Sequence, residues 1–276
     1  MIDAFRNAVI EKNVLMNLRI TFLGTGTSVG VPVIGCQCST CQSNDPRDHR
    51  MRSSIFIEAP NGNLLVDTGP DLHFQALRAN MTKVDAVLFT HAHMDHITGF
   101  DELRAFCWRR NQPLPLYANQ GCIKEIQRMF KWAFDPQNTH KGYVQAKPHS
   151  LDSDIELANI KITPLPVEHG SVETSGFRFD LPSGQCFAYI PDVKTIPTRT
   201  LSSLQNLDLL IIDALREEEH PTHMNIAQAQ AISELLGKPQ TYFTHISHEL
   251  DREKTQQSLP SHIQLAYDQL QITLPF

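Results

Sequence analysis

Long apolar runs are missing from this chain of 276 residues. A helix that crosses a membrane needs about 20 consecutive apolar residues, and no segment approaches that length. The N-terminus carries Asp3, Arg6, Glu11 and Lys12 and has no signal-peptide core. We therefore expect no membrane association and a cytoplasmic location.

Basic charge is also scarce. The chain has 24 Lys and Arg residues against 30 Asp and Glu residues, which gives a formal net charge of −6. A protein that binds long nucleic acid regardless of sequence needs a basic surface, so we expect no long nucleic acid as a partner. A small anionic substrate is still compatible with this charge, because bound cations would reverse the local field.

Cysteine is infrequent, with six residues in the chain. Disulfides are rare in cytoplasmic proteins, so these thiols are predicted to bind metal or to be buried. Three lie in apolar surroundings and are predicted core residues: Cys107, Cys122 and Cys186. The others, Cys36, Cys38 and Cys41, form a C-x-C-x-x-C cluster. Three thiols this close can converge on one tetrahedral metal; the alternative is three separate thiols.

Three of the 13 histidines, by contrast, fall within one stretch of six residues, His91-Ala92-His93-Met94-Asp95-His96. The apolar residues 84–89 before it predict a buried strand, and residues 97–106 after it predict a helix. The polar side chains would then lie on a loop between a strand end and a helix N-terminus, where α/β sheets usually place their sites. Four such donors suit two neighbouring divalent ions. A histidine-rich surface loop is the alternative.

This H-x-H-x-D-H pattern resembles the hallmark of the metallo-β-lactamase superfamily, and the resemblance extends over residues 18–274. It implies an α/β fold, an αββα sandwich in which two mixed β-sheets lie face to face, helices cover the outer faces and metals bind at one edge. The implied organisation is an N-terminal extension over residues 1–17 and a metallo-β-lactamase domain over residues 18–276.

The resemblance also implies a ligand set for two divalent ions. Its expected members are His91, His93 and His169 for one ion, Asp95, His96 and His245 for the other, and Asp192 with a water or hydroxide as the bridge. Asp67 is implied to support the metal loop through a hydrogen bond to a ligand imidazole; a turn-forming Asp-Thr-Gly is compatible with that role. The native ions are expected to be zinc or manganese, and iron is also compatible with these ligands.

The cysteine cluster resembles that of a smaller group within the superfamily. The group includes the cyclic-phosphate phosphodiesterase of the carbon–phosphorus lyase pathway and the protein associated with pyrroloquinoline quinone synthesis. In this group the thiolates hold a structural zinc, and the fourth ligand is a histidine three residues after the last active-site histidine. His248 has that position relative to His245. The resemblance thus implies one structural zinc on Cys36, Cys38, Cys41 and His248.

The function that the resemblance favours is hydrolysis of a small cyclic or nucleotide-like phosphodiester through a metal-bridging hydroxide. Two divalent ions about 3.5–4 Å apart make hydroxide available near neutral pH and hold both oxygens of an in-line displacement. Asp95 and His223 are the expected catalytic side chains. His223 resembles the non-ligand histidine of the phosphodiesterase relatives and could bind a phosphoryl oxygen or protonate the leaving alkoxide. A loop histidine beside His220 is the alternative.

Three other functions are compatible with the motifs. A tRNA 3′-processing-type ribonuclease is disfavoured by the acidic composition and by the lack of an obvious long inserted arm. A thioester or lactone hydrolase and a non-catalytic metal-binding accessory protein, like the quinone-synthesis relatives, are the others. The relatives make a homodimer reasonable.

Outside the motifs, periodicity predicts helices over residues 71–80, 120–134 and 225–236. The last helix is expected to turn Ala227, Ala231 and Leu235 towards the core. Apolar stretches predict strands at residues 114–117, 207–212 and 241–245.

Overall fold

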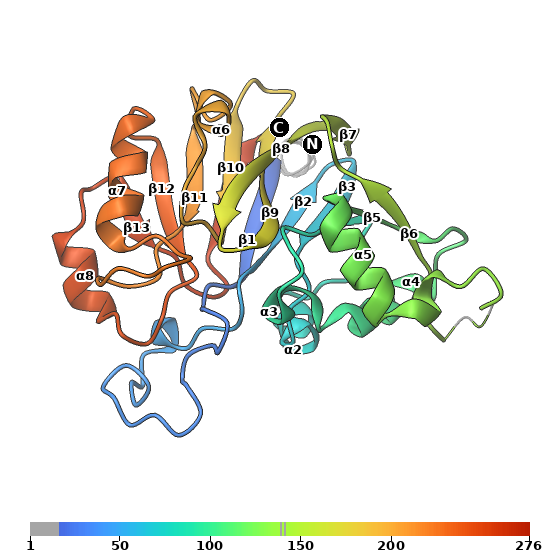
Figure 1. Ribbon diagram of the computed structural model, residues 1–276, viewed down its shortest axis with the longest axis horizontal. Coiled ribbons are helices and arrows are strands. Elements are labelled where there is room, and N and C mark those ends of the chain that lie inside the picture. The colour runs from blue at the N-terminus through green and yellow to red at the C-terminus, as the bar shows by residue number, and fades with distance from the viewer. Residues whose placement is uncertain (1–16, 139, 141) are drawn as a thin grey trace, which may run out of the picture.

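Two seven-stranded sheets lie face to face in the computed structural model, which describes residues 17–138, 140 and 142–276 (Figure 1). All but the last residue of the predicted N-terminal extension therefore lies outside the described residues. Among the residues described, no helix combines the length and the apolar character needed to cross a membrane.

The first sheet has the order β14-β1-β2-β3-β4-β5-β6. Its strands are β14 (Gln271–Pro275), β1 (Asn17–Gly24), β2 (Ser54–Ala59), β3 (Gly62–Val66), β4 (Ala86–Leu88), β5 (Leu114–Ala118) and β6 (Ala146–Ser150). Pairing is antiparallel from β14 to β3 and parallel from β3 to β6.

The second sheet has the order β13-β12-β11-β10-β9-β8-β7. Its strands are β13 (Ile263–Leu265), β12 (Gln240–Thr244), β11 (Leu209–Asp213), β10 (Cys186–Ile190), β9 (Val172–Asp180), β8 (Ile160–His169) and β7 (Ile155–Leu157). Pairing is parallel from β13 to β10 and antiparallel from β10 to β7. Both sheets are therefore mixed, as expected.

The core between the sheets is built from the strands' alternating side chains. Ile55 and Ile57 of β2 point between the sheets, whereas Phe56 points to the outer side. On the opposing sheet, Phe179 and Phe187 stack with their ring centroids 4.5 Å apart. Because the central strands are buried on both faces, their sequences are apolar throughout rather than alternating.

Helices complete both outer layers. The first sheet is covered by α2 (Leu72–Arg78), α3 (Met94–Ile97), α4 (Arg104–Cys107) and α5 (Gln120–Met129). The second sheet is covered by α6 (Thr198–Ser202), α7 (Ile226–Leu235) and α8 (Arg252–Ser258). Figure 1 shows these two groups on opposite sides of the paired sheets, so the predicted αββα sandwich is confirmed.

The predicted inward face of α7 is wrong. Ala227 and Ala231 are exposed, and Leu235 is 63% exposed, whereas Ile226 and Ala229 are buried. The start of the helix sets its rotation, since the Asn225 side chain and the third helical residue form a reciprocal capping box. The helix predicted over residues 120–134 is shorter than expected and ends at Met129. A separate 3₁₀ turn follows over residues 131–134.

Candidate metal centre

The histidine-rich segment follows β4, at the edge of the sandwich where β8, β10, β11 and β12 also end. Only His91 and His93 precede the helix, because α3 begins at Met94 and already contains Asp95 and His96. The neighbouring turn fixes this helix: the Thr68 N–H donates to the His96 carbonyl at 2.7 Å, and the Gly99 N–H donates to the Thr68 carbonyl at 2.8 Å. A Cβ at Gly99 would lie 2.0 Å from the Gly69 carbonyl oxygen, so this close approach requires glycine.

Three imidazoles converge as the first group. His91 Nε2 lies 2.9 Å from His93 Nδ1, which lies 3.3 Å from His169 Nε2. The Nδ1–H of His169 donates to the Thr222 carbonyl at 2.7 Å, so its Nε2 carries the lone pair. Tetrahedral zinc with Zn–N bonds of about 2.0–2.1 Å separates its nitrogen ligands by roughly 3.3 Å. The spacing therefore fits a shared cation, which would relieve the repulsion between converging lone pairs.

The second group consists of Asp95, His96 and His245, whose ligand atoms lie within 4.8 Å of one another. His96 Nε2 is 3.3 Å from Asp95 Oδ2. His96 Nε2 and both ring nitrogens of His245 are buried and have no hydrogen-bond partner among the described residues. Buried polar atoms are normally paired, so these orphaned nitrogens fit a site for a metal ion.

His245 is held in place by the N-terminal part of the chain. Its backbone has a left-handed φ of 58° directly after β12. The next residue, Ile246, donates its N–H to the Thr25 carbonyl at 2.9 Å and accepts from the Thr27 N–H at 3.2 Å. The glycine-rich turn after β1 is therefore a structural support for this imidazole.

Asp192 faces both groups from the loop after β10. Its Oδ2 lies 3.2 Å from His96 Nε2 and 3.4 Å from His245 Nδ1, and its Oδ1 lies 3.7 Å from His169 Nε2. The carboxylate is 2% exposed, and Oδ2 has no hydrogen-bond partner among the described residues. Its position between the groups suits a bridging carboxylate.

Asp67 is fully buried beneath the histidine segment and accepts three hydrogen bonds. The donors are the Thr90 N–H, the Thr90 hydroxyl and the His96 Nδ1–H, each at 2.8 Å. Thr90 Oγ1 in turn accepts from the His91 Nδ1–H at 3.0 Å. One carboxylate thus orients two imidazoles and leaves their Nε2 atoms directed at the site, the arrangement usual for metal-bound histidine.

His223 is brought to the same edge, together with Asp213, which the sequence analysis did not assign. The Nδ1–H of His223 donates to Asp213 Oδ2 at 2.7 Å, and the ring stacks on His245 with centroids 4.7 Å apart. Asp213 ends β11, which lies between β10 and β12 in parallel register. The neighbouring strands β10 and β12 lead to Asp192 and His245. The parallel alignment of these strands with β11 could therefore have identified Asp213 as a site residue.

The electrostatics of the edge separate the imidazoles into two kinds, but not into ligands and non-ligands. Burial opposes the charged form of the ligand His96, yet the carboxylates of Asp192, Asp95 and Asp67 raise its pKa well above the usual value. Burial lowers the pKa of His91 well below its usual value and that of His245 to about 3, which keeps both neutral and able to bind metal. Burial opposes the charged form of His223 too, but the carboxylates of Asp213 and Asp192 outweigh it and raise the pKa of His223 to about 9. Bound cations would lower that pKa.

The cysteine cluster forms a separate group around His248. The Sγ atoms of Cys36, Cys38 and Cys41 lie 3.3, 3.4 and 3.5 Å from His248 Nδ1. Tetrahedral zinc with bonds of about 2.3 Å to sulfur and 2.0–2.1 Å to nitrogen separates S from N by roughly 3.5–3.6 Å. The Cys41 N–H, followed by His248, lowers the pKa of Cys38 to about 6, whereas burial raises that of Cys41 to about 11. The four side chains thus fit one zinc ion.

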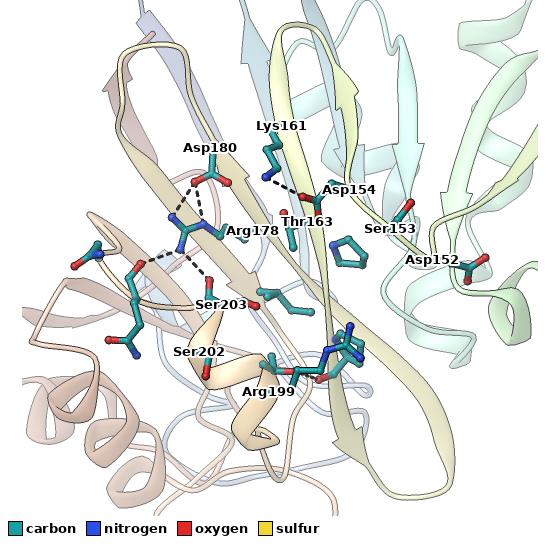
Figure 2. Close-up of a pocket in the computed structure, with 16 residues that line it drawn as sticks. Asp152, Ser153, Asp154, Lys161, Thr163, Arg178, Asp180, Arg199, Ser202 and Ser203 are labelled. Carbon is teal, nitrogen blue, oxygen red and sulfur yellow. Dashed lines mark hydrogen bonds and ion pairs between the residues drawn. The ribbon is translucent and has the colours of Figure 1, made fainter.

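A large surface cavity lies elsewhere. Figure 2 shows this cavity of about 1010 Å³, which lies on the outer face of the second sheet beside α6. None of the residues of the two metal groups lines it, and its charges are largely paired: Arg178 with Asp180 and Lys161 with Asp154, both at 2.8 Å. The convergence of ligand atoms, rather than cavity size, therefore identifies the candidate site.

Comparison with known proteins identifies the family of this fold. Residues 62–246 match the family model described as a beta-lactamase superfamily domain. A solved structure described as a new diphosphatase from the PhnP family superposes with a TM-score of 0.86 and 40% identity, covering 94% of this chain and 98% of that one. Zinc-bound PqqB from Methylobacterium extorquens superposes with a TM-score of 0.74 and 21% identity, covering 92% of this chain and 99% of that one, which shows likeness of fold.

A further relative is the octanoyltransferase of Porphyromonas gingivalis, which is 35% identical over 259 residues. The match covers 92% of this chain and 51% of that protein. The chain thus spans about half the length of this relative.

Proposed function

Because this chain belongs to the metallo-β-lactamase superfamily and, within it, to the PhnP family, we propose that it is a metal-dependent hydrolase that cleaves phosphodiester-type linkages in small molecules. The candidate substrates are cyclic or nucleotide-like phosphodiesters and diphosphates esterified at both ends. These substrates share one feature: the attacked phosphorus carries two bridging oxygens and a single negative charge.

The ligands that we assign to two divalent ions are the two groups already described. His91, His93 and His169 would hold one ion, Asp95, His96 and His245 the other, and Asp192 would contact both. When bound, zinc or manganese would supply Lewis-acid activation of water and of the phosphoryl oxygens. Cys36, Cys38, Cys41 and His248 would hold a structural zinc.

We assign to His223 the transfer of a proton to the leaving oxygen. Its Nδ1–H is committed to Asp213, so Nε2 is the nitrogen that can reach a substrate. Asp213 fixes the orientation of the ring and favours its protonated form, which is the form that a general acid needs. His223 is 6% exposed, so burial also limits its rotation.

The observation that carries this proposal is the placement of a carboxylate-held imidazole against the seven converging ligands. Its ring centroid lies 4.6 Å from that of His169 and 4.7 Å from that of His245. We assign the two ions to seven other side chains, although His223 also forms a group of possible metal ligands with His169 and Asp192. A histidine in this place is therefore available for proton transfer or phosphate binding.

The test is His223→Ala, assayed with one good and one poor leaving group. A general acid typically contributes about 10²–10⁴-fold, and it matters most for the poor leaving group. We expect that loss for an alkyl phosphodiester, a much smaller loss for bis(p-nitrophenyl) phosphate, and unchanged metal content. His149→Ala is the control, because His149 lies in the edge strand β6 and stacks on Tyr117.

Two other results would revise the assignment. Equal slowing of both substrates would make His223 a phosphate-binding residue. Loss of metal would make it a ligand.

A second candidate function is thioester hydrolysis. It is supported by the 35% identity to part of an octanoyltransferase, although this chain spans only about half of that protein. A panel of bis(p-nitrophenyl) phosphate, a dinucleoside diphosphate, an octanoyl thioester and a precursor tRNA separates the candidates. Turnover of the thioester alone would favour the second function, and turnover of none would favour a non-catalytic accessory protein.

A further inference from the structure

The segment that carries His245 is joined to the first sheet through one short turn. Residues 25–27 follow β1, and this turn pairs with Ile246 in an isolated parallel bridge. Because β12 belongs to the second sheet and β1 to the first, the bridge fixes His245 relative to the loop of the first sheet that leads to Asp95 and His96. The position of the turn therefore determines how closely His245 approaches the other two members of its metal group.

A buried carboxylate from the C-terminal part of the chain holds this turn. Asp268 lies in the connection between β13 and β14, and its side chain is 1% exposed. Its Oδ1 accepts from the Thr25 N–H at 3.0 Å and from the Thr25 hydroxyl at 2.9 Å, and its Oδ2 accepts from the Met51 N–H at 2.8 Å. The Met51 carbonyl in turn accepts from the Gly26 N–H at 2.8 Å. Asp268 thus holds the turn directly through Thr25 and indirectly through Met51.

Arg50 supplies a buried positive charge to the same network. It is 3% exposed, and its guanidinium donates to the Thr25 hydroxyl at 2.8 Å and to the Ala266 carbonyl. Burial raises the pKa of Asp268 to about 6, which still leaves the carboxylate ionised at pH 7. The Thr25 hydroxyl therefore accepts from a cation and donates to an anion. Hydrogen bonds to charged groups are about twice as strong as neutral ones, so this relay makes the turn a firm support.

The first metal group is joined across the two sheets by a different contact. His169 ends β8, and the paired strand β9 donates the Ser175 N–H to the Thr90 carbonyl at 3.0 Å. Thr90 belongs to the loop after β4, which carries the histidine segment of the first sheet. This contact uses neither Asp268 nor Thr25. The two metal groups are thus held by separate connections between the sheets.

We propose that Asp268 is a positioning residue for the second metal group alone. Through Thr25 it holds His245 where the ring can share an ion with Asp95 and His96, and it thereby raises the affinity of that group for metal. The affinity of the first group does not depend on it. This inference rests on the ligand sets of the proposed function, but it concerns metal binding rather than the choice of substrate.

The direct test is Asp268→Asn. The two backbone donors point at different oxygens of the carboxylate, so in either orientation the asparagine NH₂ group faces a fixed N–H, that of Thr25 or that of Met51. The turn therefore loses one of its two attachments while the volume of the side chain is kept. Circular dichroism and thermal melting of the metal-free protein establish that the variant is folded.

Metal affinity is measured by competition with a chromophoric chelator in two backgrounds. His169→Ala leaves the second group complete, and His245→Ala leaves the first group complete. Asp268→Asn should weaken binding about 10-fold in the His169→Ala background, the lower end of the range for a residue behind a metal ligand. It should leave binding unchanged in the His245→Ala background. A general loss of stability would not produce this difference.

The alternatives give other results. Equal weakening in both backgrounds, or none in either, would overturn the inference and leave the ligand sets intact. If His169→Ala or His245→Ala alone retains both ions, the ligand sets are wrong, and the inference fails with them.

Thr25→Val provides a milder second variant, because it removes only the hydroxyl of the relay, whereas Thr25→Ser keeps that hydroxyl. Valine should weaken the second group alone, and serine should retain most of its affinity. Thr241→Val is the matched control, since Thr241 is equally buried and lies near the start of β12, the strand whose other end leads to His245. A Thr25→Val protein that binds metal as Thr241→Val does would contradict the role of the relay.

Discussion

Replacement of Asp67 by asparagine should weaken metal binding and destabilise the fold at the same time. Asn fits the space of Asp and also tolerates the left-handed backbone of this position, where φ is 63°. The change therefore removes one negative charge and one acceptor while the backbone is kept. Its effects come from the three donors that now point at the Asp67 carboxylate.

The magnitude follows from those three hydrogen bonds. An asparagine amide has one oxygen, so its NH₂ group faces either the Thr90 backbone N–H, whose proton is fixed, or His96 Nδ1. In the second orientation the His96 proton can move to Nε2, which then becomes a buried donor without an acceptor. A buried donor left without an acceptor costs about 1–3 kcal/mol. For a domain of this size that corresponds to a fall in Tm of roughly 2–12 °C. Loss of the carboxylate behind His96 should also lower metal affinity by about 10–100-fold.

Two assays separate these effects. Thermal melting of the chelator-treated protein reports the lost hydrogen bonds, and competition with a chromophoric chelator reports metal affinity. Asp85→Asn is the matched control, because Asp85 accepts a hydrogen bond from the Asn63 N–H at 2.9 Å but lies before β4, away from the histidine segment. If Asp67→Asn matches wild type in metal affinity, Asp67 does not support the ligands, and an unchanged Tm would show that its hydrogen bonds are replaced.

Two other substitutions test the two kinds of metal group. Asp192→Ala removes the carboxylate that faces both histidine groups. Turnover should fall by more than the roughly 10–100-fold that is typical when a residue behind a metal ligand is changed, while the circular dichroism spectrum stays native. Near-wild-type hydrolysis would exclude a binuclear mechanism that needs this bridge. Cys38→Ser should lower Tm and remove one metal per chain by elemental analysis, because thiolate ligation couples metal affinity to folding; an unchanged metal content would mean that the cysteines are ordinary thiols.

The parts of the site that could be predicted from sequence are those with dense local spacing. The H-x-H-x-D-H segment and the C-x-C-x-x-C cluster each contain several ligand types within a few residues, and the fold family then places His169, Asp192 and His245. The role of Asp213 could not be predicted from local spacing. A single aspartate at a strand end carries no local pattern, and its contact with His223 arises only when parallel strands bring their ends together.

The ends of helices and their buried faces were also harder to predict, because contacts outside the local sequence pattern determine them. We expected a loop at Asp95 and His96, but these residues lie in the first turn of α3. The Thr68 N–H donates to the His96 carbonyl, and the Gly99 N–H donates to the Thr68 carbonyl. Thr68 lies outside the motif in sequence, so the motif alone could not predict these hydrogen bonds. The inward face of α7 follows from the capping box at Asn225, which rotates Ile226 and Ala229 towards the second sheet. Periodicity alone could not distinguish this face from one that contains Ala227 and Leu235, since both faces carry small or apolar residues.

The contact between Ile246 and the turn after β1 has a consequence for biosynthesis. The ribosome makes the chain from its N-terminus, yet the turn that supports His245 is held in part by Asp268, which accepts from the Thr25 N–H at 3.0 Å. The histidine-rich segment at residues 91–96 is therefore synthesised long before its partners at residues 169, 192 and 245. The complete set of candidate ligands is thus assembled only after residue 245 has been made, and a nascent chain halted before that residue would present the imidazoles of residues 91–96 without the supporting strand β12.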